Sequence, residues 1–399
     1  MIDLEDLGLD RGGHLLVRRA LAGLAPGERL AVRGRAPELG VHLAGWCRSQ
    51  GHALVEREDP GAGEVVAWVV RGSADDDRWR GAQVAGAPDP RRPGALADHA
   101  SSTWGLAARG ATVEAGSPAF DFPLDRREQV WTDDAPRLYR QAAAAQWDPA
   151  TAVPWDAPLT HPPEVEAAVV QVMTYLVENE QAALAVPARF LGRIHPHFRE
   201  VVAVLAVQVA DEARHAEVFA RRAGLAGGEL GRSSAGGQAS LLSLLEEPDF
   251  ALAHFLLSVL GEGTFLSLLA FIERHAPDPV TAAVARLALA DEARHVAFGM
   301  AHLGEVVASD PAQRGRLAAA IHRRHDALAS TAGLNAEVVD ALVVLAAGVF
   351  SPAAVASGFA LVQALEAEMA EGRRRRLARL GFAPHEAAEL AALHTRNFM

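Results

Sequence analysis

The pentapeptide Asp-Glu-Ala-Arg-His occurs twice in this 399-residue chain, at 211–215 and again at 291–295. Each copy lies in a long run whose apolar residues recur at helical spacing. Within each copy the glutamate and the histidine are three residues apart, so on a helix they project from the same face. The repeat therefore predicts two helices that each present one carboxylate and one imidazole to the same side.

A lone glutamate lies on the apolar face of the helical run before each copy. The predicted runs cover about 164–192, 197–223, 250–275 and 279–309. On the third run, Glu262 is flanked by apolar residues at helical spacing, namely Phe255, Val259, Phe265, Leu266 and Leu269. On the first run, Glu178 and Glu180 compete for the same role. Only Glu180 has apolar neighbours at every helical spacing, so we favour it over Glu178.

Two Glu-x-x-His pairs and two further glutamates, one from each of four helices, form the ligand set of dinuclear carboxylate sites in helical bundles. Carboxylate oxygen and imidazole nitrogen suit iron, and four carboxylates balance two divalent cations. The predicted ligands of two iron ions, or of a Mn/Fe pair, are Glu180, Glu212, His215, Glu262, Glu292 and His295. We expect Asp211 and Asp291 to orient the two imidazoles, although each could equally be a solvated helix charge. We interpret His254 as a core histidine rather than a third imidazole.

The composition and the hydrophobic periodicity change along the chain and predict three zones. Residues 1–72 mix amphipathic helical stretches (15–24 and 40–54) with β-prone runs (29–34 and 65–72), which predicts a small α/β sandwich. Residues 73–133 are rich in Pro, Gly and Ala and predict a loop-rich linker or lid. Residues 134–399 are almost entirely helical and predict a mainly α bundle with additional helices.

Bulk properties restrict the partners. The formal net charge of -12 argues against nucleic acid and anionic membrane surfaces. The single cysteine, Cys47, excludes a CxxC motif. The uncharged run 341–365 is long enough to span a bilayer, but Ser351-Pro352 breaks it, so we expect buried helix segments there. With no secretory signal at its start, the chain is expected to be cytoplasmic and not membrane-bound, and we prefer a docked C-terminal tail at 394–399.

The twin motif with Glu180 and Glu262, together with the lead-in at 138–156, resembles the ferritin-like di-iron oxygenase superfamily, which includes ribonucleotide reductase small subunits and arylamine N-oxygenases. Phe219 stands where radical-forming subunits place a tyrosine. Ala288 stands where N-oxygenases carry an additional histidine. Residues 14–72 resemble TusA-type sulfur carriers, but Asp10 stands at the position of the sulfur-carrying cysteine, and Cys47 is expected to be a small buried residue.

The resemblance implies an enzyme that activates O2 to hydroxylate, desaturate or N-oxygenate a small organic substrate. Its electrons would come from an external donor, a ferredoxin or a reductase, because the sequence shows no flavin, nicotinamide or iron–sulfur motif. A homodimer is compatible with the sequence. The alternative is a non-enzymatic iron-binding or ferroxidase-type protein, since ligands alone do not establish turnover.

Overall fold

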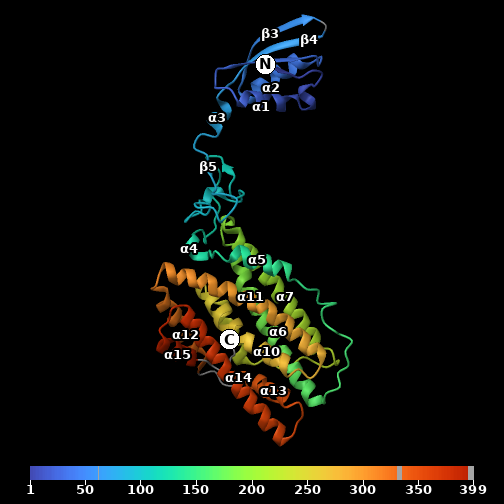
Figure 1. The fold of residues 1–399 in the computed structure, drawn as a ribbon, viewed down its shortest axis with the longest axis vertical. Coiled ribbons are helices and arrows are strands. Elements are labelled where there is room, and N and C mark those ends of the chain that lie inside the picture. The colour runs from blue at the N-terminus through green and yellow to red at the C-terminus, as the bar shows by residue number, and fades with distance from the viewer. Residues whose placement is uncertain (62, 330–334, 394–399) are drawn as a thin grey trace. The chain divides into compact units, whose positions relative to one another are not determined.

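The computed structural model describes residues 1–61, 63–329 and 335–393 (Figure 1). Its contacts divide the chain into two compact units. The first consists of Met1–Ala85 with Gly110–Pro118, and the second of Gly86–Arg109 with Ala119–Met399. The zone predicted at 73–133 is thus shared between the two units, and its role as a linker or lid stays a prediction.

The first unit contains a four-stranded sheet in the order β1-β2-β4-β3. The strands are β1 (Ile2–Asp3), β2 (Arg29–Gly34), β3 (Ala53–Gly61) and β4 (Glu64–Val70), and only β1 and β2 run parallel. Helices α1 (Gly13–Ala22) and α2 (Leu39–Gln50) pack their apolar residues against the sheet. The unit also holds η1 (Leu9–Arg11), α3 (Ala74–Arg78), and the paired strands β5 (Gln83–Val84) and β6 (Thr112–Val113).

The predicted α/β sandwich is confirmed in outline, with one correction. The amphipathic stretch 40–54 is not helical to its end, because Gly51 adopts φ +70 and caps α2 at Gln50. The chain then enters β3, a strand that the sequence did not predict. Cys47 is 1% exposed, and burial raises the pKa of its thiol to about 11, which fits the small buried residue expected there. The resemblance to sulfur carriers stays a prediction.

The second unit is a helical bundle, as the sequence predicted. Its core helices are α6 (Pro163–Leu191), α7 (Arg199–Ala223), the composite helix α9–η4–α10 (Phe250–His254, Phe255–Glu262, Gly263–Arg274) and α11 (Pro279–Ser309). Local chemistry sets their starts. Pro163 occupies the first turn of α6, and the Asp278 side chain accepts a hydrogen bond from the Thr281 backbone N–H at the start of α11. All four predicted helical runs are confirmed to within a few residues.

The middle of the third core helix is π-helical, with Phe255–Glu262 forming η4. A π-helix bonds i to i+5, is rare in proteins and concentrates at functional sites. All eight of its residues are buried, and it ends on Glu262. The continuous helix expected at 250–275 therefore contains a widened turn at the position of the predicted ligand.

The remaining helices of the second unit lie around this core (Figure 1). They are η2 (Ser102–Trp104), α4 (Arg127–Val130), α5 (Ala135–Ala144), η3 (Pro196–Phe198), α8 (Ala235–Leu245), α12 (Gln313–Ala329), α13 (Ala336–Ala347), α14 (Pro352–Arg379) and α15 (Pro384–Ala392). Among them, α13 packs against α6, and α14 packs against α10.

The expectation of buried helix segments across 341–365 is correct for α13 and wrong for the start of α14. Phe359 is 54% exposed, because only Gly358, Val362 and Leu365 of that stretch of α14 face the bundle, and Phe350, between α13 and α14, is 69% exposed. Two described helices are long and apolar enough to cross a bilayer, residues 250–274 with 83% of the apolar window buried and residues 352–379 with 22%. The tail predicted to dock, 394–399, lies outside the described residues.

Candidate metal centre

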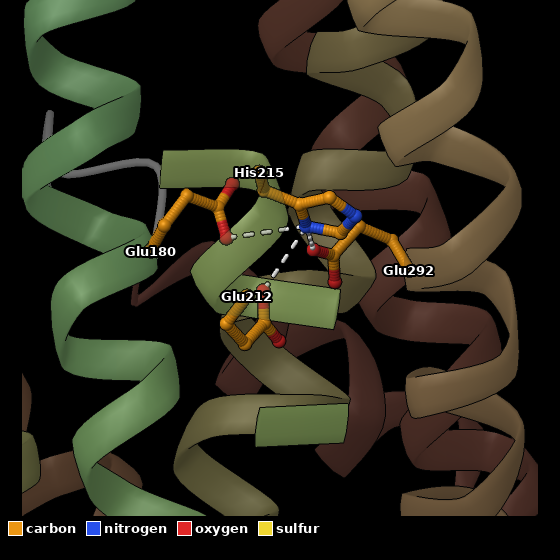
Figure 2. A group of neighbouring side chains, drawn as sticks. All are labelled: Glu180, Glu212, His215 and Glu292. Carbon is orange, nitrogen blue, oxygen red and sulfur yellow. Dashed lines mark hydrogen bonds and ion pairs between the residues drawn. The ribbon is translucent and has the colours of Figure 1, made fainter. Parts of the chain in front are cut away.

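The six predicted ligands converge from the four core helices. Glu180 comes from α6, Glu212 and His215 from α7, Glu262 from the end of η4, and Glu292 and His295 from α11. None of the six is more than 4% exposed. Figure 2 shows four of them, with the carboxylates of Glu180, Glu212 and Glu292 directed at the His215 ring. The sequence places these residues far apart, so only the packing of the bundle brings them together.

Their donor atoms form two overlapping groups. In one, atoms of Glu180, Glu212, His215 and Glu292 lie within 4.8 Å of one another. In the other, atoms of Glu212, Glu262, Glu292 and His295 do the same. Glu212 and Glu292 therefore belong to both groups, while each remaining glutamate and each histidine belongs to one.

The two shared carboxylates divide their oxygens between the groups. Glu212 places Oε2 3.1 Å from His215 Nδ1 and Oε1 3.0 Å from His295 Nδ1. Glu292 places Oε1 3.4 Å from His215 Nδ1 and Oε2 3.4 Å from His295 Nδ1. This is the arrangement that two bridging carboxylates need in order to span a pair of metal ions.

Each imidazole binds an aspartate of the other pentapeptide through Nε2, the ring nitrogen that points away from the glutamates. His215 Nε2 lies 3.1 Å from Asp291, and His295 Nε2 lies 3.1 Å from Asp211. Since an aspartate carboxylate accepts, Nε2 carries a proton on both rings, and Nδ1 faces the glutamates, where loss of its own proton would free a lone pair for a metal ion. The two aspartates thus lie where they can set the tautomer and the orientation of both imidazoles.

Arg214, Gln146 and Trp147 join the two aspartates. The Arg214 guanidinium donates to Asp211 at 2.6 Å and to Asp291 at 2.9 Å. Gln146 Nε2 donates to Asp211 at 2.7 Å, and the Trp147 indole N–H donates to Asp291 at 2.8 Å. Both aspartates are therefore saturated by donors. Arg294 also donates to Asp291.

Sequence reasoning missed three of the polar groups around the site. Gln146 and Trp147 follow the end of α5, within the lead-in whose resemblance to related proteins was the only signal. Gln208 lies one turn before Glu212 and donates to Glu262 Oε1 at 2.9 Å. Its signal was a polar residue one helical turn from a predicted ligand. Glu178 is only half-buried and belongs to neither donor group, while His254 is fully buried and likewise belongs to neither.

Burial and crowding perturb the ionisation of the cluster. Burial, together with the neighbouring carboxylates, raises the pKa of Glu180 and of Glu262 well above the usual range. Burial alone would lower the pKa of His215 and of His295, but the surrounding carboxylates outweigh it and raise both well above the usual range. Four buried carboxylates thus compete for positive charge, and without cations they must share protons.

The donor set fits two divalent cations. Glu180 Oε1 and Glu262 Oε2, one from each donor group, are buried and have no hydrogen-bond partner among the described residues. A buried carboxylate oxygen without a partner is costly, and a metal ion in each group would satisfy both. Each ion would receive one imidazole nitrogen and one terminal carboxylate, with Glu212 and Glu292 shared between them.

No family model matches the chain, and no curated protein does. Among solved structures, the chain is similar to R2-like ligand-binding oxidases. A variant with an aerobically reconstituted Mn/Fe cofactor is 19% identical with a TM-score of 0.47, the match covering 62% of this chain and 94% of that one. A variant with an Fe/Fe cofactor is 19% identical with a TM-score of 0.48 and the same coverage. A likeness of this degree carries no conclusion about chemistry, so the function proposed below rests on the geometry of the site.

Proposed function

We propose that this chain binds a dinuclear metal cofactor, two iron ions or one manganese and one iron, and uses it to oxidise a small organic substrate with O2. The observation that carries the proposal is the pair of overlapping donor groups that share Glu212 and Glu292. Isolated buried acid–histidine pairs are ordinary, but two groups with this shared geometry have a specific use in holding two cations side by side.

The residues divide the work of holding such a cofactor. Glu212 and Glu292, which belong to both donor groups, would be shared by the two ions, while His215 and Glu180 would hold one ion and His295 and Glu262 the other. When bound in the ferrous state, the metal pair would supply the electrons that reduce O2. The protein contributes fixed ligands, oriented imidazoles and a surrounding from which bulk water is excluded.

Several finer features extend the proposal. An external ferredoxin or reductase would return the metals to the reduced state, because the described residues offer no second redox cofactor site with metal-ligand spacing. The reaction would be a hydroxylation, a desaturation or an N-oxygenation. The buried, apolar surroundings of the cluster favour a small organic substrate over a macromolecule.

Anaerobic loading with ferrous iron followed by a pulse of O2 tests the proposal. We expect two iron ions per chain, consumption of O2 in proportion to the ferrous iron lost, and no oxidation beyond the bound pair. Growth of a ferric mineral with continued iron supply would instead support the iron-handling alternative. Failure to bind iron, or ferrous iron that stays unreacted under air, would contradict both functions.

A further inference from the structure

A row of buried polar side chains leads away from Glu262 along its own helix. Ser258 and His254 precede Glu262 by four and eight residues, and a spacing of four is close to one turn of both α- and π-helices. Both side chains are 0% exposed. Both His254 ring nitrogens have no hydrogen-bond partner among the residues that the structure describes, and the Ser258 hydroxyl lies next to Glu262. Three polar groups thus follow one face of a helix that is otherwise apolar.

His302 continues the row on the facing helix α11. Its ring centroid lies 6.1 Å from that of His254, with the rings nearly perpendicular at 81°. Phe250 packs against both imidazoles. Its ring centroid lies 4.4 Å from that of His254 and 5.1 Å from that of His302. His302 Nε2 donates to the backbone carbonyl of Gln129 at 3.0 Å, and its Nδ1 has no partner within the described part of the chain.

The row reaches a surface cavity. Gln129 and Phe250, which contact His302, both line a cavity of about 310 Å³. Asp249 and Arg316 form an ion pair at 2.7 Å in the wall of the same cavity. One layer of residues therefore separates His302 from a polar opening on the surface of the second unit.

The energetics of the row argue against a purely structural role. A buried polar atom without a partner is costly, so three of them on two neighbouring imidazoles are expensive for a core that phenylalanine could fill. Ordered water would satisfy these atoms, because each of them can form a hydrogen bond with a water molecule. A row of side chains linked by water would also be able to pass protons.

The two histidines have the ionisation that such conduction needs. Burial lowers the pKa of His254 to about 3 and that of His302 to about 4, so both rings are neutral near pH 7. His254 is faced by His302 and by Arg189 of α6, which further disfavour its charged form, whereas Asp249 at the start of α9 favours that of His302. A neutral imidazole has one donor and one acceptor nitrogen and can accept a proton at one while releasing another.

We propose that His302, His254 and Ser258 carry protons from the surface cavity to the Glu262 side of the metal centre. The inference rests on the proposed function, because reduction of O2 to water consumes protons that a buried site must import. In each transfer one N–H or O–H bond breaks as the next forms, and no electrons move along the row. These three are positioning residues for the proton, and none of them belongs to either donor group.

Two substitutions and a matched control test the proposal. His254→Phe keeps an aromatic ring among Phe250 and Phe298 but cannot pass a proton, and Ser258→Ala removes only the hydroxyl. The control is Thr264→Val on the same composite helix, since the Thr264 hydroxyl is equally buried but bonds its own backbone at Leu260. Metal content, the rate of ferrous oxidation by O2 and its solvent deuterium isotope effect are measured for all of them. Crystal structures of the wild type and of both variants locate ordered water.

We expect His254→Phe and Ser258→Ala to bind two metal ions as the wild type does, to oxidise ferrous iron about tenfold more slowly or worse, and to show an altered isotope effect. Thr264→Val should match the wild type, and water should lie within hydrogen-bond distance of Ser258 and His254. Wild-type rates and isotope effects in both variants, or dry contacts around these atoms, would overturn the relay. If His254→Phe does not fold, Ser258→Ala decides the matter. A wild-type chain that binds no metal would instead defeat the proposed function.

Discussion

Replacement of Asp291 by asparagine isolates the contribution of one imidazole support. The Asp291 carboxylate is 1% exposed and accepts from His215 Nε2 at 3.1 Å, from Trp147 at 2.8 Å, from Arg214 at 2.9 Å and from Arg294. An asparagine offers one acceptor oxygen and turns an NH2 group toward donors. At least one buried donor then loses its partner, and the His215 ring loses the charge that fixes its tautomer.

The expected loss falls on one metal position. Removing the outer partner of a ligating histidine weakens metal binding by about 10- to 100-fold, which corresponds to about 1.4–2.7 kcal/mol. His215 belongs to only one of the two donor groups. One equivalent of metal per chain should therefore bind about 10- to 100-fold more weakly in Asp291→Asn, while the other stays close to its wild-type affinity.

Competition with a chromophoric chelator under anaerobic conditions resolves the two binding steps. Glu178→Gln is the control, because Glu178 lies on α6 within two residues of a predicted ligand but outside both donor groups. It should titrate like the wild type. Two unchanged steps in Asp291→Asn, or two steps weakened equally, would refute the assignment of one supported histidine to each metal.

Three further outcomes follow from the structure. Glu180→Gln should lower the bound metal from two ions per chain toward one, and elemental analysis that still finds two would argue against its role as a terminal ligand. Arg222→Met should destabilise the fold by about 3–5 kcal/mol in urea unfolding, because it leaves Asp278 buried and unpaired; a change below about 1 kcal/mol would contradict this. Burial depresses the pKa of His302 to about 4 and of His254 to about 3, so the unfolded chain binds protons that the native chain does not. The free energy of unfolding should then fall by about 2 kcal/mol per histidine as the pH is lowered from 7 to 5. If the unfolding free energy of His302→Phe depends on pH as strongly as that of the wild type, the expectation is wrong.

The sequence predicted correctly the features that depend on residues of a single helix. The spacing within each pentapeptide placed Glu and His on one face, and the apolar neighbours of Glu180 separated it from Glu178. These features depend on residues within a few turns of each other, so a single sequence contains them.

Features that depend on packing between helices could not be predicted from the sequence. The exchange of partners, in which each aspartate supports the histidine of the other helix, is set by how α7 and α11 cross. Trp147 reaches Asp291 from a loop with no periodicity. The π-helical segment that ends at Glu262 contains the same kinds of apolar residue as a buried α-helix, so its sequence pattern does not distinguish the two. Exposure at the start of α14 likewise depends on which face the bundle covers.

Two metal ions are expected side by side between the four core helices. Anomalous diffraction at the iron edge, from crystals of the iron-loaded protein, locates bound iron. We expect two peaks per chain, one beside His215 Nδ1 and the other beside His295 Nδ1, with the carboxylates of Glu212 and Glu292 between them. A single peak, or iron bound away from these residues, would contradict it.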